Sequence, residues 1–311
     1  MRKIWLGLTV ASLTAASAVF AGPSDPDDRY FDLPKLTQPP VLDGERGADE
    51  WAGALEWACS NSQIVADGAK YGWREQETGR SDVSANQLNQ SEGEDASIAR
   101  TDDDYAATIW QAWDDDGFYY ITEVRDNVRD VVGGERLESW WERDSMSLYV
   151  DLINNKEESG EANGYVAMNI INFVAAPQNA SAVNITWEYI VAGSREPTQD
   201  PDVIEGFTYG FRDAGDEFGG ETDYVIEGMM PWDTLLRFNL PGAPTVGSEM
   251  GACWIGLDPD NDGGYGGQLQ CWGWADDPSN YATWIFSDIP AGPSGTAVEA
   301  DSWGRIKTTF N

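Results

Sequence analysis

The sequence contains no histidine, and this absence alone excludes several kinds of active site. Without an imidazole there is no Ser-His-Asp or Cys-His catalytic machinery and no zinc site with a histidine ligand. The usual axial ligand of haem is missing as well. Most familiar hydrolase and metalloenzyme classes are therefore excluded.

Basic residues are also scarce, with 19 Lys and Arg against 54 Asp and Glu and a formal net charge of -35. Such a surface repels phosphate backbones, so no nucleic-acid partner is expected. Only five of the basic residues are lysines, and together with the acidic excess this suggests a saline setting. Hydrophobic residues still make up 41% of the chain, which predicts a folded protein rather than a disordered acidic one.

Long hydrophobic runs are rare, and the clearest one lies at the N-terminus. Two basic residues precede an apolar run over residues 4–10, and small residues follow up to Ala21. This pattern predicts a secretory signal over residues 1–21, and the run is shorter than the ~20 residues of a membrane-spanning helix. We expect a secreted protein (extracellular, periplasmic or on the cell surface) without membrane insertion.

The chain has three cysteines, and export would permit a disulfide between two of them. Cys253 and Cys271 lie on either side of a turn centred near Asp262, where they could face each other across a hairpin. We predict that they are bridged and that Cys59 remains as a buried free thiol. The spacing alone does not fix the connectivity.

Composition divides the remainder of the chain into three parts. Residues 22–40 are rich in Pro and Asp without periodicity, and we interpret them as an exposed lead-in. Residues 41–311 contain short runs of Val, Ile, Tyr, Trp and Thr between Gly, Asn and Asp clusters, which is typical of a single all-β domain. Within it, residues 60–100 are polar and are interpreted as a long insertion.

Turn signals separate the predicted strands. The sequence Asp-Asp-Asp-Gly at 114–117 predicts a tight hairpin, and residues 258–267 separate the last two strands in the same way. Adjacent strands are therefore expected to be antiparallel. The clearest predicted strands are 106–113, 118–125, 145–152, 165–174, 184–191, 224–230, 253–257 and 270–274.

A series of short motifs follows in collinear order between residues 40 and 307. They are PVLDG at 40–44, DEW at 49–51, WDD at 113–115, FY at 118–119, WERDS at 141–145, YVD at 149–151, YVIE at 224–227, MPW at 230–232, IGLDPD at 255–260, WADDP at 274–278 and WGRI at 303–306. In this order they resemble the family 9 carbohydrate-binding modules and related sugar-binding sandwich domains. The resemblance implies an antiparallel, jelly-roll-like β-sandwich that binds sugars without cutting them, often with structural calcium.

The resemblance also implies a pair of tryptophans that clamp sugar rings. Aromatic rings suit this role because a pyranose presents an apolar C–H face. By motif position the clamp corresponds to Trp141, in a polar loop before a strand, and Trp284, with Trp140 as the alternative to Trp141. By contrast, four tryptophans sit in motifs that resemble scaffold positions, and they are Trp51, Trp113, Trp232 and Trp303.

The sequence departs from the family where sugar hydroxyls would be held. Ser147 stands where the family usually has a carboxylate, and residues 166–168 lack the usual basic residue. Either Glu142, Arg143 or Asn169 takes over the polar contacts, or the protein binds a different ligand or none.

The acidic run at 258–263 predicts a calcium loop. Asp258, Asp260 and Asp262 alternate and Gly263 follows, as in the first half of a calcium-binding loop, but the twelfth position is Leu269. We expect a hairpin loop completed by a distant carboxylate, with a solvated acidic turn as the alternative. The Asp runs at 102–104 and 114–116 are interpreted mainly as surface charge.

These observations predict a secreted, noncatalytic carbohydrate-binding protein whose partner is a poly- or oligosaccharide, with calcium and without haem or nucleotide. One alternative is a cell-surface or matrix protein that self-assembles and uses the sandwich as a scaffold. A second is a glycoside hydrolase that uses paired carboxylates. A third, a haem-bearing redox module, is disfavoured by the missing histidine.

Overall fold

The described part of the chain consists mainly of strands. The computed structural model describes residues 29–60, 62–63, 101–129, 144–156, 165–173, 183–191, 194–198, 208–236, 240–258, 268–272 and 281–293. The elements are β1 (Tyr30–Leu36), β2 (Leu55–Ser60), β3 (Tyr105–Trp113), β4 (Gly117–Asp126), β5 (Ser145–Asp151), β6 (Tyr165–Phe173), β7 (Val183–Val191), β8 (Ser194–Thr198), β9 (Thr208–Gly215), β10 (Asp223–Pro231), α3 (Trp232–Leu235), β11 (Glu249–Leu257), β12 (Gln268–Cys271) and β13 (Ala282–Ala291). The predicted strands all correspond to one of these, within a few residues at each end.

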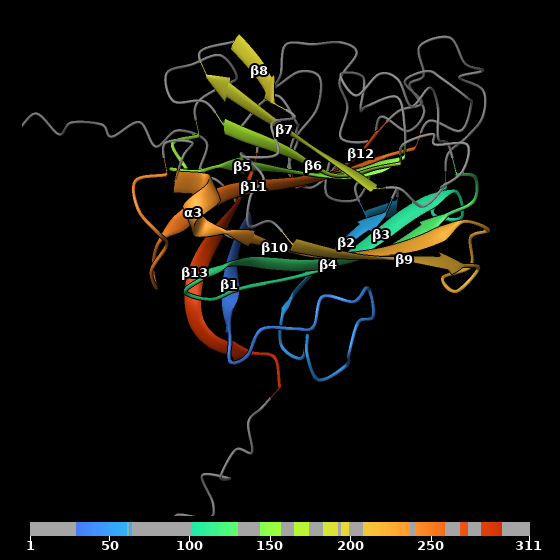
Figure 1. Cartoon of the computed structure of the whole chain (residues 1–311), viewed down its shortest axis with the longest axis horizontal. Helices are drawn as coiled ribbons and strands as arrows, with labels where there is room; N and C mark the ends of the chain where they lie inside the picture. Colours follow the sequence, from blue (N-terminus) through green and yellow to red (C-terminus); the bar gives the residue numbers. More distant parts are fainter. Residues whose placement is uncertain are drawn as a thin grey trace, which may run out of the picture.

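The strands pair in one continuous sheet that folds over into two layers (Figure 1). One layer holds β2, β3, β4, β10 and β9, and the other holds β8, β7, β6, β5, β11 and β12. Strands β13 and β1 lie between β11 and β3 in the pairing order and connect the layers. The predicted all-β sandwich is confirmed.

Strand β1 corrects two predictions. Residues 30–36 lie inside the sheet rather than in an exposed lead-in, and Leu33 is fully buried. Strand β1 is parallel to both β13 and β3, so the expectation of antiparallel neighbours fails here. Pro34 lies at the register shift between Leu33 and Lys35, where a residue without an N–H is tolerated. Asp32, Pro34 and Lys35 interrupt the apolar alternation, so the strand was not visible in the sequence.

The two layers enclose the main hydrophobic core, which contains buried residues from β1 to β5 and β10 to β13. Trp113 packs against Phe286 and its indole N–H donates to the Ser287 carbonyl over 3.0 Å. The predicted scaffold roles of Trp51, Trp113 and Trp232 are confirmed by their burial. Trp303 lies outside the described residues.

A second, smaller core lies on the opposite face of β3, β4 and β10. It contains Leu36, Trp51, Trp110, Ala112, Tyr119, Ile121, Val225 and Ala291. Residues 41–51, called the strap below, run across this face and carry Trp51 into it (Figure 1). The DEW motif thus places an aromatic anchor under a loop that otherwise consists largely of polar residues and glycine.

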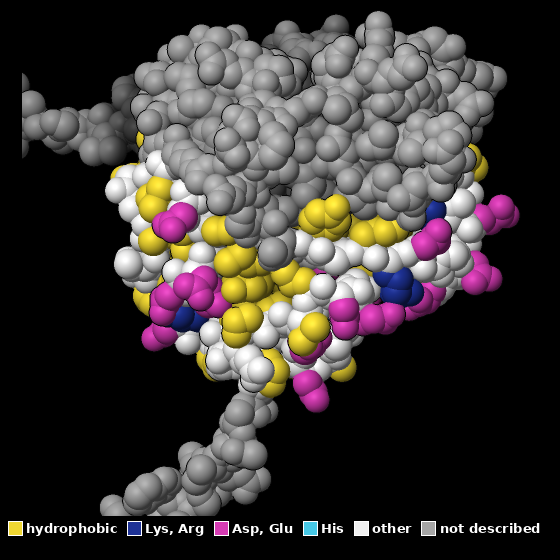
Figure 2. Space-filling view, viewed as in Figure 1, with side chains coloured by type: hydrophobic (Ala, Val, Ile, Leu, Met, Phe, Trp, Pro, Cys, Tyr) yellow, Lys and Arg dark blue, Asp and Glu magenta, His cyan; other side chains and the backbone are white. Residues whose placement is uncertain are grey.

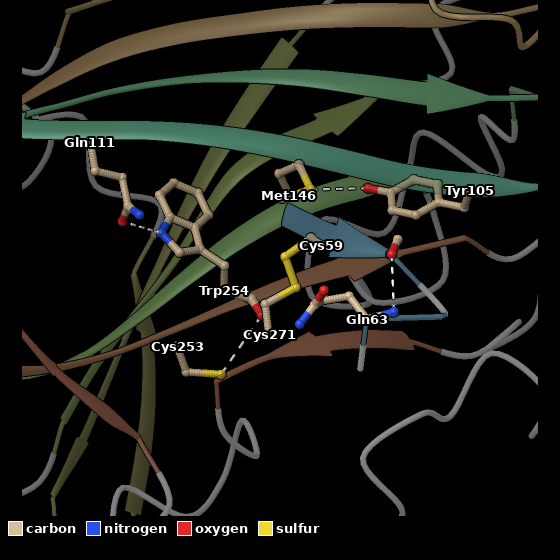
Figure 3. The surroundings of a disulfide bond; sticks show 9 residues. Cys59, Gln63, Tyr105, Gln111, Met146, Cys253, Trp254 and Cys271 are labelled. Atoms are coloured by element: carbon tan, nitrogen blue, oxygen red, sulfur yellow. Dashed lines mark hydrogen bonds between the residues drawn. A yellow bond between two sulfur atoms is a disulfide. The ribbon is translucent and has the colours of Figure 1, made fainter. Parts of the chain in front are cut away.

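One disulfide joins Cys59 of β2 to Cys271 of β12, with a Cα–Cα distance of 5.7 Å (Figure 3). It links two strands that lie off the main pairing order, β2 beside β3 and β12 beside β11, and so joins the two layers covalently. The predicted Cys253–Cys271 bridge is therefore wrong, and Cys253, not Cys59, is the buried free thiol.

The register explains this outcome. Cys271 lies opposite Trp254, and both side chains belong to the core between the layers. Because successive strand residues point to opposite faces, Cys253 points away from that core. Cys59 belongs to the same core as Cys271, and its strand was not recognised in the sequence.

The acidic excess is visible on the surface of the described part. On the face in Figure 2, Asp and Glu side chains occupy much of the rim and Lys and Arg side chains are fewer. Among the described residues there is no helix with the length and apolar character needed to cross a membrane.

Candidate ligand face and acidic end

Several strand ends meet at the end of the sandwich opposite α3. Tyr105 at the start of β3 pairs with Asp126 at the end of β4. On the other layer, the first residue of β5 pairs with Leu257, so Asp144 and Asp258 directly flank a register pair. We call this end, defined by Tyr105, Asp126, Asp144, Tyr224 and Asp258, the acidic end. Here the segment 140–143 leads into β5, and β11 leads into the acidic run at 258–263.

The acidic end is buried. The side chains of Asp126, Asp144 and Asp258 are fully buried. The Tyr105 hydroxyl donates to the Met146 sulfur over 3.0 Å and lies 3.3 Å from the Tyr224 hydroxyl.

Burial raises the pKa of Tyr105 well above its usual value, and the three carboxylates raise it further. The pKa of Tyr224 is raised in the same way, first by burial and then by the neighbouring Tyr105 and acidic groups. Both hydroxyls therefore stay protonated and act as hydrogen-bond donors at this end.

Only some of the predicted ligand residues lie in the part of the chain that the structure describes. Trp140, Trp141, Glu142 and Arg143 lie outside the described residues and directly precede Asp144 in the sequence. Asn169 lies on β6, where its register partner on β5 is Ser147. The structure thus brings Asn169 beside the residue that replaces the family carboxylate.

Ser147, which stands where the family usually has a carboxylate, indicates which face of the layer containing β5 would contact a ligand. Its neighbours Met146 and Leu148 point into the main core, so Ser147 points to the opposite face of the layer, where it is also buried. Across β11 its register partner is Ile255. We refer to this face of β5, β6 and β11, on which Ser147 and Ile255 are both buried, as the candidate ligand face.

Trp284 does not lie on that face, and its predicted role is corrected. It belongs to β13, and it is 1% exposed. Its ring stacks on that of Phe118 with a centroid–centroid distance of 4.7 Å, and its centroid lies 6.1 Å from the ring centroid of Trp57. With both neighbours in the main core, Trp284 has no free face on which a sugar ring could stack.

The calcium prediction rests partly on described residues. Asp258 follows β11 and is fully buried, whereas Asp260 and Asp262 lie outside the described residues. Within the described ranges, no group of three or more Asp, Glu or Cys is arranged to hold a metal ion. A buried carboxylate at the first position of the predicted loop fits a calcium ligand, and the other ligands would come from the remainder of that loop.

The other acidic runs have local roles. Asp115 is 85% exposed and pairs with Lys35 over 2.6 Å. Asp103 is equally exposed and pairs with Arg125 over 2.9 Å. Asp114 caps the β3–β4 turn by accepting from the backbone N–H of Asp116 over 2.8 Å. These contacts agree with the interpretation as surface charge and turn formation.

One polar residue was not singled out by the sequence. Glu227 lies in the apolar strand β10 and is fully buried. Its carboxylate accepts from the Trp51 indole over 2.9 Å and from the backbone N–H groups of Asp43 and Gly44 over 3.0 and 3.2 Å. An acid within the otherwise apolar run YVIEGMM is the signal that could have revealed it.

A comparison with models of protein families identifies the family of the chain. The model described as carbohydrate family 9 binding domain-like matches residues 83–288. This chain belongs to that family. The match covers the acidic end, the candidate ligand face and the segment before β5, so the family supports carbohydrate binding as the function.

Solved structures of one family member are similar to the chain. A family 9 carbohydrate-binding module from Caldicellulosiruptor kristjanssonii in complex with cellotriose is 15% identical, with a TM-score of 0.47, covering 86% of this chain and 97% of that chain. The same module in complex with glucose is 14% identical, with a TM-score of 0.48, covering 86% and 98%. A comparison with curated protein sequences gave no significant match.

Proposed function

We propose that this protein is an exported, noncatalytic carbohydrate-binding protein. It binds sugar rings with tryptophan side chains of the segment before β5, and polar contacts come from the candidate ligand face. The observation that carries the proposal is the family match over residues 83–288, which includes both regions. In the motif WERDS, Trp141 lies three residues before the buried Asp144, and Trp140 is its neighbour in the sequence.

The physical basis is aromatic stacking. Burying roughly 100 Å² of apolar sugar and indole surface contributes about 2–3 kcal/mol before the losses of association. Because Trp284 is buried, the segment before β5 supplies the stacking surface without it. Weak to moderate affinity follows, and the hydroxyl contacts of Asn169, Glu142 and Arg143 determine which sugar is preferred.

Calcium is part of the proposal, as a structural ion at the acidic end. Asp258, with Asp260 and Asp262, would hold it through carboxylate oxygens, the ligands that calcium prefers. When bound, the ion would supply positive charge beside three buried carboxylates. Asp144, directly before β5, and Asp258, directly after β11, flank the register pair of Ser145 and Leu257 and so lie at the same end of the sandwich.

The test is a tryptophan-fluorescence or calorimetric titration of the mature protein, with calcium, against glucose, cellotriose and a panel of other mono- and oligosaccharides. Saturable binding is expected, and Trp141→Ala or Trp140→Ala should weaken it at least tenfold. The matched control is Tyr209→Ala, which removes an aromatic ring that is 42% exposed on β9 of the other layer and should leave affinity unchanged.

Two outcomes would contradict the proposal. If no sugar produces a response while the circular dichroism spectrum shows an intact fold, the sandwich acts as a scaffold for assembly. If reducing ends accumulate when an oligosaccharide is incubated with the protein, it is a hydrolase.

A further inference from the structure

The strap is held to the sandwich by a buried carboxylate, that of Glu227, in addition to the packing of Trp51. All three donors to the Glu227 carboxylate come from the strap: two successive backbone N–H groups, those of Asp43 and Gly44, and the indole of Trp51. Gly44 has a φ of 82°, and a Cβ there would lie 3.0 Å from the Arg212 Cβ. The close approach and the left-handed backbone both favour glycine, so the sequence Asp-Gly lets two successive N–H groups reach one carboxylate oxygen.

Apart from the packing of Trp51 in the second core, the other contacts of the strap are partly or fully exposed to solvent. Arg46 pairs with Glu123 over 2.7 Å, and its guanidinium lies 4.1 Å from the ring centroid of Trp110. Arg212 donates to the Gly44 carbonyl over 3.1 Å. Exposed ion pairs of this kind contribute up to about 1 kcal/mol each. The Glu227 carboxylate is therefore the buried polar anchor of the strap.

Burial, three hydrogen bonds and the charge of Asp43 set the pKa of Glu227. Burial is the largest influence on its pKa and raises it to about 7, while the bonds from Trp51, Gly44 and Asp43 lower it and the Asp43 charge raises it. The elements around it carry other titratable and charged groups. They are Asp43, Glu45, Arg46, Asp49 and Glu50 on the strap, Tyr119, Tyr120 and Glu123 on β4, Tyr209 and Arg212 on β9, and Glu217 after β9. The pKa of Tyr120 is raised well above its usual value by burial, so its hydroxyl stays protonated at neutral pH.

We propose that Glu227 and the strap form a pH-dependent latch, in which the strap is held more firmly in mild acid and opens more readily as the pH rises above neutral. The sign follows from linkage. Opening exposes Glu227 to water and returns its pKa towards 4.5, so opening releases a proton and is favoured by high pH. With the closed-state pKa about 7, the opening equilibrium rises up to about 70-fold between pH 5 and pH 8.

Native-state hydrogen exchange tests the latch. The amides of Asp43 and Gly44 should lose up to about 70-fold in protection between pH 5 and pH 8, after correction for intrinsic exchange rates. Amides in the β3–β4 hairpin serve as the internal control and should not follow the same titration. Trypsin cleavage after Arg46, normalised to a model peptide at each pH, should rise in parallel.

Two variants separate the latch from general pH effects. Glu227→Gln is uncharged at every pH, so protection of the strap should no longer depend on pH. Trp51→Phe removes the indole donor, and because that bond lowers the Glu227 pKa, the midpoint should move to higher pH. Unchanged wild-type protection across this range, or the same pH dependence in Glu227→Gln, would overturn the proposal. Neither readout requires sugar, so failure of sugar binding leaves it standing.

Discussion

The Asp223 carboxylate accepts a 3.0 Å hydrogen bond from the backbone N–H of Asp126, and so joins the start of β10 to the end of β4. The same carboxylate accepts from the N–H groups of Gly220 and Phe218 over 3.1 and 2.5 Å. In return, the Asp126 carbonyl accepts from Glu221 and Thr222. The loop before β10 is therefore folded around these two residues at the acidic end.

Replacing Asp223 should destabilise the fold. Asp223→Ala leaves three backbone N–H groups without their acceptor, and we expect a loss of about 2–4 kcal/mol in the free energy of unfolding, measured with urea. Asp115→Asn removes an exposed ion pair with Lys35 and should change stability by less than about 1 kcal/mol. Equal effects of the two substitutions would contradict the role assigned to Asp223.

The disulfide makes a second prediction. Peptide mapping under non-reducing conditions should recover Cys59 linked to Cys271, and Cys59→Ser should destabilise the protein by about 4–5 kcal/mol because the bridge closes a loop with a sequence separation of 212. Cys253→Ala should cost about 1 kcal/mol and leave the bridge intact. Recovery of a Cys253–Cys271 peptide would show that the register of β11 and β12 is different.

Trp284 should behave as a core residue. Trp284→Ala should cost about 3–5 kcal/mol of stability because it leaves a cavity beside Phe118 and Trp57. In Trp284→Phe, which keeps an aromatic ring, sugar affinity should be that of the wild type. If this variant is stable but binds sugar more than tenfold more weakly, Trp284 contacts the ligand.

Calcium removal should lower the melting temperature. Chelator should reduce it by several degrees, and added calcium should restore it, because an ion that binds only the folded state stabilises that state. Asp258→Asn, which removes the buried carboxylate of the predicted loop, should abolish the calcium response. A melting temperature that is insensitive to chelator in the wild type would exclude a structural ion.

Global stability should also carry the signature of Glu227. Its pKa is raised on folding, so the stability that it contributes is complete below about pH 4.5 and is lost as the pH rises through about 7. The full difference is about 3.4 kcal/mol, of which about 2.5 kcal/mol falls between pH 5 and pH 8. Urea titrations at pH 5 and pH 8 should show a larger decrease in the wild type than in Glu227→Gln. Parallel decreases would assign the effect to other groups.

Most of the sheet could be predicted from the sequence, because β3, β4, β5, β10 and β11 are rich in β-branched and aromatic residues between clear turn signals. It did not reveal β1, whose strand character comes from pairing with β13 and β3 rather than from alternation. Parallel pairing between distant segments leaves no local signal, and neither β1 partner is joined to it by a turn.

The candidate site was predictable only in part. The motif order identified the family and the segment before β5, because those positions are set by sequence spacing. Whether Trp284 is buried or available to a ligand depends on which face of β13 it occupies. Which cysteine pairs with Cys271 depends on the register between β11 and β12, where Cys271 lies opposite Trp254 rather than Cys253. Such features are fixed by packing across the sandwich, which spacing along one strand does not encode.

The pairing of Tyr30 with Thr283 brings the first and last described strands together in the sheet. Because β1 separates β13 from β3, the two layers are joined only after nearly the whole chain is available. Such long-range pairing makes folding slow. A partly synthesised chain that lacks β13 therefore cannot complete the sheet.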